Sequence, residues 1–179
     1  MINLNNYIEE KAERLLIDAN CFSAPIDVRK CAEYLNVEIQ DLDLDYDVSG
    51  FVIIKKDAST IGYNKANPPK RIRFTLAHEL GHICLHSQDV PLFIDKIEKF
   101  NRDGNSSTGE ILREREANAF AAALLMPEKL VRDQVETVNT AEGNNYIADL
   151  ASKFEVSDQA MTIRLTNLGL LDYDAFAAE

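Results

Sequence analysis

The sequence contains no tryptophan and little cysteine or histidine, with three residues of each of the last two among 179. Cys21, Cys31 and Cys84 show no CxxC spacing, which fits reduced thiols in a cytoplasmic protein better than a disulfide framework. The longest apolar run covers residues 119–126 and is too short to cross a bilayer. The N-terminus has acidic residues and no continuous apolar core, so it is not a secretory signal. These absences predict a cytoplasmic protein without a membrane segment.

Positive charge is also in short supply. Lys and Arg number 19 against 30 Asp and Glu, so the net charge is −11 and the pI is about 4.7. A protein of this charge repels nucleic acid and attracts a basic partner. Acidic residues dominate positions 1–50 and basic ones dominate 51–86, which predicts a locally basic groove on an acidic surface. Arg71 and Arg73 in that basic segment are either solvated or hold a substrate carboxylate.

Hydrophobic periodicity predicts an α+β fold that is mainly helical. Residues 37–64 alternate apolar and polar side chains, with a turn at Ser49-Gly50, and predict a small antiparallel sheet. Residues 101–110 predict a polar loop. Residues 1–138 are expected to form one domain, and residues 139–179 a helical, helix-turn-helix-like subdomain packed on it. The segments with helical spacing are 5–20, 28–35 after an N-cap at Asp27, 70–86, 110–125, 126–138 and 146–171.

Two of the three histidines lie in the pentad His-Glu-Leu-Gly-His, inside the helix expected at 70–86. Residues four apart project from one helix face, so His78 and His82 can hold one Zn²⁺ ion. Glu79 borders that face and is placed to act on the water of the metal rather than on the metal itself. Gly81 costs the helix about 1 kcal/mol relative to alanine and therefore predicts the close approach of another backbone. The alternative to a metal site is that the polar residues of the pentad merely border a buried helix.

A catalytic zinc site needs a third protein ligand. His86 follows one turn later, but three ligands along one straight helix cannot converge on one centre, and Gln88 stands where a metzincin would have histidine. The segment EREAN offers two glutamates on opposite sides of its helix. Glu114 shares a face with Asn118, which is then placed to reach a ring N–H of a ligand histidine. Periodicity favours Glu114 over Glu116 without deciding between them.

The segments RFTLAHELGHICLH and EREANAFAAALLMP closely resemble the paired motifs of the ImmA/IrrE family of zinc metallopeptidases. The resemblance covers roughly residues 25–130 and implies a zincin-like core. Several members of the family cleave a helix-turn-helix repressor, and their genes lie in phages, mobile elements or stress loci. The resemblance therefore predicts a zinc endopeptidase with a protein substrate that acts as an anti-repressor. The roles it implies are zinc ligand for His78, His82 and Glu114, catalytic base for Glu79, and support of a ligand histidine for Asn118.

Two other functions compete with the peptidase hypothesis. One is a transcription regulator whose C-terminal helices bind DNA, with Gln159, Arg164 and Asn167 as the residues available to a groove. Residues 144–179 carry six acidic residues against Lys153 and Arg164, the wrong sign for binding phosphate. The other is a non-catalytic adaptor that binds a repressor without cutting it.

Overall fold

The computed structural model describes residues 4–55, 58–87, 92–96, 108–138 and 146–171. It confirms the α+β expectation, with a small sheet among many helices. None of the helices in these ranges combines the length and apolar character needed to cross a membrane. The elements are α1 (Leu4–Asp18), α2 (Val28–Tyr34), β1 (Val37–Leu42), β2 (Val48–Ile53), β3 (Ser59–Asn64), α3 (Pro69–His86), β4 (Leu92–Lys96), α4 (Thr108–Leu125), α5 (Glu128–Val138), α6 (Tyr146–Lys153) and α7 (Asp158–Asn167).

The sheet has the strand order β1-β3-β2-β4 and is mixed rather than purely antiparallel. β2 runs antiparallel to both β3 and β4, whereas β1 runs parallel to β3. The chain reverses direction between successive strands, so the first and third strands point the same way, and they are neighbours because β3 lies between β1 and β2. The prediction of an antiparallel sheet missed this insertion, and it also missed β4.

The turn predicted at Ser49-Gly50 is wrong, because both residues lie within β2 and the chain turns at residues 46–47 instead. Gly50 serves a packing purpose. A side chain there would place its Cβ 2.5 Å from Cγ2 of Thr75 on α3, so glycine lets the strand approach the helix closely.

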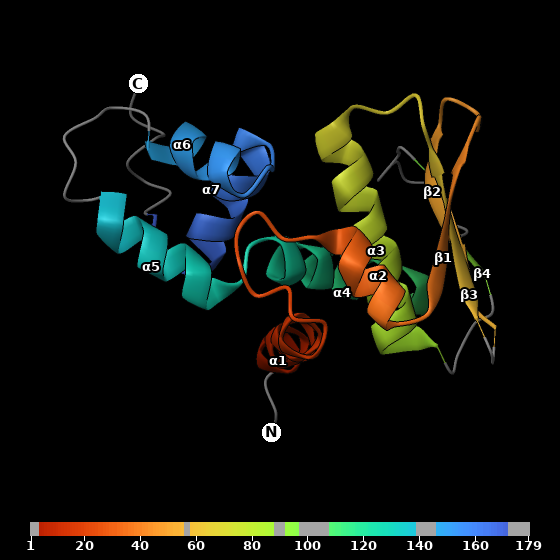
Figure 1. Ribbon diagram of the computed structural model, residues 1–179, viewed down its shortest axis with the longest axis horizontal. Coiled ribbons are helices and arrows are strands. Elements are labelled where there is room, and N and C mark those ends of the chain that lie inside the picture. The colour runs from red at the N-terminus through yellow and green to blue at the C-terminus, as the bar shows by residue number, and fades with distance from the viewer. Residues whose placement is uncertain (1–3, 56–57, 88–91, 97–107, 139–145, 172–179) are drawn as a thin grey trace.

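The helices cover one face of the sheet. Figure 1 shows α2, α3 and α4 on the same side of the strands, with α5, α6 and α7 at the far end of the molecule. α3 lies between the sheet and α4, and every residue from Thr75 to His82 is buried. The helix that carries the pentad is therefore surrounded by protein along its middle turns.

The start of α2 agrees with its local signal. The Asp27 side chain accepts a hydrogen bond from the backbone N–H of Lys30 at 3.0 Å, as expected of an N-cap. The loop predicted at 101–110 is shorter at its C-terminal side, because α4 already begins at Thr108. Residues 101–107 lie outside the described part of the chain.

The two predicted C-terminal helices are present as α6 and α7, joined by a short turn in which Glu155 has a positive φ of 54°. Polar contacts attach this pair to the rest of the fold. Arg164 is 5% exposed, donates to the backbone oxygen of Met126 at 2.9 Å and forms a two-point ion pair with Glu9 of α1. Arg164 therefore cannot enter a DNA groove. A helix-turn-helix function is not confirmed.

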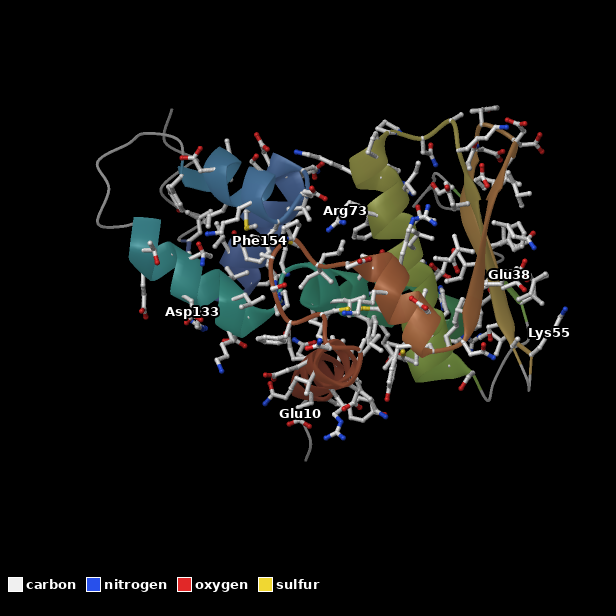
Figure 2. The ribbon with its side chains drawn as sticks, in the orientation of Figure 1. Glu10, Glu38, Lys55, Arg73, Asp133 and Phe154 are labelled. Atoms are coloured by element: carbon white, nitrogen blue, oxygen red, sulfur yellow. The ribbon has the colours of Figure 1, made fainter. Side chains whose placement is uncertain are left out.

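A second link joins α3 to the C-terminal helices. In Figure 2, Arg73 points from α3 towards the turn between α6 and α7. Its guanidinium lies 3.3 Å from a carboxylate oxygen of Glu155 and donates to the backbone oxygen of Ile26 at 3.0 Å. Arg73 thus has a structural role at this junction. The boundary predicted at residue 138 adjoins residues 139–145, which lie outside the described ranges, and it stays a prediction.

Replacing Glu9 with glutamine should lower the thermal stability of the protein. The change leaves the buried Arg164 guanidinium without its charged partner, at a cost of about 1–3 kcal/mol, which corresponds to a fall in Tm of roughly 2–10 °C for a protein of this size. Thermal unfolding followed by circular dichroism measures this. The neighbouring Glu10→Gln, at an exposed position of the same helix, is the control and should change Tm little; equal losses in both variants would contradict the ion-pair argument.

Candidate metal centre

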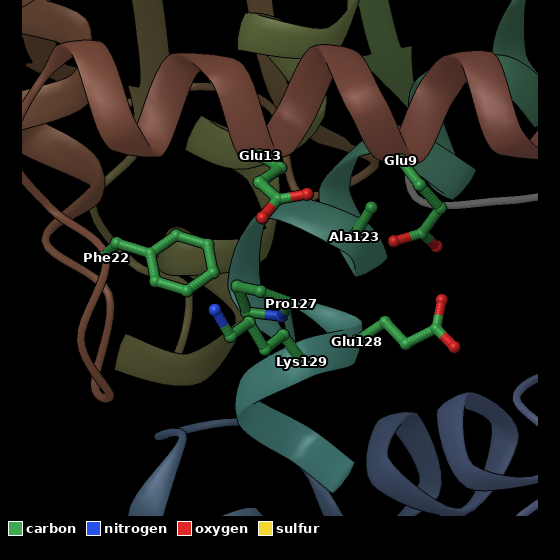
Figure 3. A pocket seen from close by; sticks show the side chains of 7 residues that line it. All are labelled: Glu9, Glu13, Phe22, Ala123, Pro127, Glu128 and Lys129. Carbon is green, nitrogen blue, oxygen red and sulfur yellow. The ribbon is translucent and has the colours of Figure 1, made fainter. Parts of the chain in front are cut away.

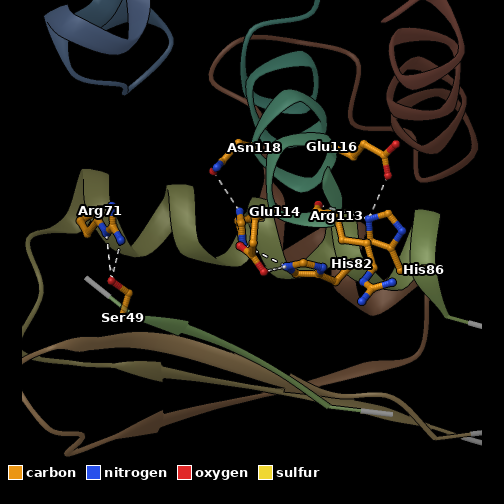
Figure 4. A network of polar contacts seen from close by, with 9 residues as sticks. Ser49, Arg71, His82, His86, Arg113, Glu114, Glu116 and Asn118 are labelled. Carbon is orange, nitrogen blue, oxygen red and sulfur yellow. Dashed lines mark hydrogen bonds and ion pairs between the residues drawn. The ribbon is translucent and has the colours of Figure 1, made fainter. Parts of the chain in front are cut away.

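Three potential metal donors from two helices converge at the centre of the fold. His78 and His82 come from α3 and Glu114 from α4, and their donor atoms all lie within 4.8 Å of one another. Nε2 of His78 is 3.1 Å from Nε2 of His82. The two carboxylate oxygens of Glu114 lie 3.2 Å from Nε2 of His78 and 3.4 Å from Nε2 of His82. Figure 4 shows Glu114 of α4 next to His82 of α3.

These separations suit zinc. Zinc binds nitrogen and oxygen ligands at about 2.0–2.2 Å, so neighbouring ligand atoms at tetrahedral angles are about 3.3–3.6 Å apart. The three observed distances lie between 3.1 and 3.4 Å. Two imidazoles and a carboxylate also form a donor set typical of catalytic zinc sites. A cation among these atoms would remove the repulsion between their lone pairs.

Asn118 orients one of the histidines. Its side-chain oxygen lies 3.1 Å from Nδ1 of His78. When a metal takes the Nε2 lone pair, Nδ1 carries the proton and donates a hydrogen bond to the amide oxygen. The lone pair of His78 is then on Nε2, which faces His82 and Glu114. This contact agrees with the role that the spacing of Glu114 and Asn118 suggested.

The two glutamates of EREAN point to different histidines. Glu114 faces His78 and His82, whereas Oε2 of Glu116 lies 3.5 Å from Nε2 of His86. His86 also lies 3.3 Å from the backbone oxygen of Arg113, and it is not part of the converging group. Figure 4 shows the two carboxylates turned apart. The geometry thus favours Glu114 as the third donor.

The protonation states of this group match metal binding. Burial would raise the pKa of Glu114, but in the absence of a metal ion the hydrogen bonds and charge interactions with His78 and His82 together outweigh burial and lower the pKa to about 2. Burial also lowers the pKa of His82. Both shifts favour the ionised carboxylate and the neutral imidazole, which are the forms that bind a metal.

Glu79 is fully buried between α3 and the sheet. One of its carboxylate oxygens lies 3.6 Å from the position that a Cβ of Gly50 would occupy. Gly50 thus leaves room for this carboxylate as well as for Thr75. The pattern of residues 37–64 indicated a turn at Gly50 and carried no sign of the room that Gly50 leaves for Glu79.

The close contact predicted by Gly81 is confirmed. A Cβ at position 81 would lie 3.1 Å from both the Cα and the backbone oxygen of Ala117, and 3.2 Å from Cβ of Phe120. α3 and α4 therefore touch through their backbones one residue before His82 and three residues after Glu114. This contact sets the distance across which the donors meet.

Arg71, one of the basic residues near the predicted site, has a structural role. Arg71 donates to the hydroxyl of the buried Ser49 through two nitrogens, at 3.1 and 2.6 Å, and so ties the start of α3 to β2.

A separate hollow lies between α1 and the corner where α4 meets α5 (Figure 3). It contains none of the predicted site residues, and its lining is Glu9, Glu13, Phe22, Ala123, Pro127, Glu128 and Lys129.

Comparison with known proteins agrees with this geometry. The family model of the IrrE N-terminal-like domain, a peptidase family, matches residues 32–166. The chain belongs to this peptidase family. The match includes both helices that carry the donor group, α3 and α4, and ends within α7. The α+β fold and the zinc-type donor set are thus found in a chain of an IrrE-type metallopeptidase family.

Individual relatives support the same assignment. The chain is 35% identical over 103 residues to the radiation response metalloprotease IrrE of Deinococcus radiodurans, an alignment that covers 58% of this chain and 29% of the relative. It is 28% identical over 131 residues to uncharacterized immunity region protein 2 of Bacillus phage phi105, covering 71% and 78%. The chain thus spans less than a third of the IrrE protein and most of the phage protein.

Replacing Gly81 with alanine should lower Tm, although alanine is the better helix former by about 1 kcal/mol. The added methyl group would push α3 away from Ala117, at a cost of about 1–3 kcal/mol, or roughly 2–10 °C in Tm. Thermal unfolding of the metal-free protein measures this. Gly109→Ala, in the exposed first turn of α4, is the matched control and should leave Tm unchanged or slightly raised. A rise in Tm for Gly81→Ala would show that the helices do not touch there.

Proposed function

We propose that this chain is a zinc-dependent endopeptidase with His78, His82 and Glu114 as ligands and Glu79 as the catalytic base. The observation that carries the proposal is the convergence of the three donor atoms at 3.1–3.4 Å. Glu79 follows directly after the first of these ligands and is buried beside β2. Membership of a peptidase family supports the same activity.

The chemistry divides between the metal and the side chains around it. A zinc ion bound by these ligands would polarise the scissile carbonyl and lower the pKa of a water. The Glu79 carboxylate would take a proton from the attacking water and pass it to the nitrogen of the leaving amine. Asn118 would hold His78 in the tautomer that leaves Nε2 free for the metal.

The substrate would lie as an extended strand along β4. Within the described residues β4 pairs on one side with β2 and is the last strand of the sheet. A peptide can add to such an edge through backbone hydrogen bonds. Phe93 of β4 stacks on His82, so a peptide on this edge would run next to the proposed ligands.

We propose a helix-turn-helix transcriptional repressor as the substrate, cleaved in the cytoplasm. The name of the phage relative refers to an immunity region. The net charge of −11 also suits a basic partner such as a DNA-binding protein. The cysteines are all free thiols in the structure, as expected of a reducing compartment.

The alternative of a DNA-binding regulator loses support from the packing of α7. The basic residues of 144–179 are Lys153 and Arg164, and Arg164 is buried in its ion pair with Glu9. The cleavage assay described next distinguishes a non-catalytic adaptor from a peptidase.

Glu79→Gln should keep its zinc and lose hydrolysis by at least about 100-fold, because the base is removed and the ligands are not. The assay uses zinc-loaded protein with a helix-turn-helix repressor encoded in the same locus, and with casein as a general substrate, read by mass spectrometry of the fragments. Undiminished cleavage by Glu79→Gln would exclude the mechanism. Cleavage of casein alone would refute the repressor proposal and keep the peptidase, and capture of the repressor without cleavage of either substrate would favour the adaptor.

Glu114→Gln should weaken zinc binding by more than about 100-fold, since the carboxylate supplies a ligand and its charge. Glu116→Gln is the matched control, two residues away on the same helix, and should bind zinc as the wild type does. Competition with a chromophoric chelator measures both affinities. The reverse order of effects would make Glu116 the ligand.

A further inference from the structure

The two histidines of the proposed metal site are held in different ways. Nδ1 of His78 donates to Asn118, whereas Nδ1 of His82 is buried and has no hydrogen-bond partner among the described residues. A metal-binding histidine ordinarily uses its second ring nitrogen to fix its orientation through a hydrogen bond. When Nε2 binds a metal, a contact other than a hydrogen bond from Nδ1 must therefore orient the ring of His82.

An aromatic ring lies against His82. The centroids of His82 and Phe93 are 4.1 Å apart and the ring planes differ by 15°, which is a face-to-face stack. Phe93 is 9% exposed and His82 is 1% exposed, so both rings are confined by their surroundings. The neighbouring His86 is only tilted towards His82, at 5.6 Å. The close, parallel contact is the one with Phe93.

The position of Phe93 is set by the sheet. Side chains alternate between the two faces of a strand, and the neighbours Leu92 and Ile94 are 46% and 50% exposed while Phe93 is buried. Phe93 pairs in register with Val52 of β2, which is fully buried. The strand register thus directs the phenyl ring towards α3.

We propose that Phe93 is a positioning residue for the metal ligand His82, taking the place of the missing hydrogen bond. The proposal rests on the metal site described above and adds a residue with no donor atom of its own. Stacking fixes the plane of the imidazole and so the direction of the Nε2 lone pair. It also makes β4, the strand proposed to take the substrate, part of the metal site.

Phe93→Leu keeps an apolar side chain and removes the ring. It should weaken zinc binding by about 3- to 10-fold, the range that corresponds to losing one aromatic stack. It should also change the visible absorption of the Co²⁺-substituted protein, because the His82 ring can then turn. Phe93→Tyr keeps a stacking ring and should restore both the affinity and the spectrum. Chelator competition and absorption spectroscopy provide these readouts without an activity assay.

Phe51→Leu is the matched control. Phe51 is on β2 and pairs with Ile94 on the other face of the sheet, where its ring packs over Gly62. The same exchange there removes aromatic packing from the sheet but should leave zinc affinity and the Co²⁺ spectrum unchanged. Circular dichroism of the metal-free proteins checks folding, and Phe93→Met replaces the leucine variant if the latter does not fold.

The outcomes separate this proposal from the proposed function. Zinc binding by Phe93→Leu equal to that of the wild type would overturn the role of Phe93 and leave the metal site intact. An equal loss in Phe51→Leu would show that only the stability of the sheet matters, and would overturn it too. A wild-type protein that binds neither zinc nor cobalt would instead refute the metal site itself.

Discussion

The site depends on one close contact, the approach of Gly81 on α3 to Ala117 on α4. Packed helices are usually 8–10 Å apart, and the distance is set by the side chains at the contact. Here glycine meets alanine, so the two backbones can touch. Only at such a short separation does one glutamate side chain from α4 reach two histidines on α3. A larger residue at either position would leave both helices folded but push them apart, and so would separate the metal-donor atoms.

The site also carries a free-energy cost, because it places polar side chains in the core. His78, Glu79 and His82 are at most 2% exposed and lie among apolar side chains, where polar groups are expensive unless they are satisfied. The amide of Asn118, the carboxylate of Glu114 and the ring of Phe93 each compensate part of this cost. The Nε2 atoms of the two histidines point to one place, where they meet the carboxylate of Glu114. A core that accepts such residues departs from the pattern that maximises stability, as functional sites commonly do.

The local part of the structure followed from the sequence. Helical spacing predicted that His78 and His82 share a face, Asp27 predicted a helix start, and Gly81 predicted a close backbone contact. The choice between Glu114 and Glu116 could not follow from periodicity, because α4 buries residues on several sides, from Ala117 to Leu125. What separates the two glutamates is tertiary, namely that His86 lies beside one of them and the histidine pair beside the other.

The parts that the sequence did not reveal are those that depend on pairing across the chain. β4 is five residues long, and its place next to β2 depends on contacts with residues some forty positions earlier. Gly50 looked like a turn because glycine is common in turns, whereas here its use is the space it leaves for Thr75 and Glu79. Histidine and glutamate can be found in a sequence by their chemistry, because few other residues bind zinc. A phenylalanine that orients a ligand carries no such mark, since core packing uses the same residue, and only the stacked geometry with His82 distinguishes it.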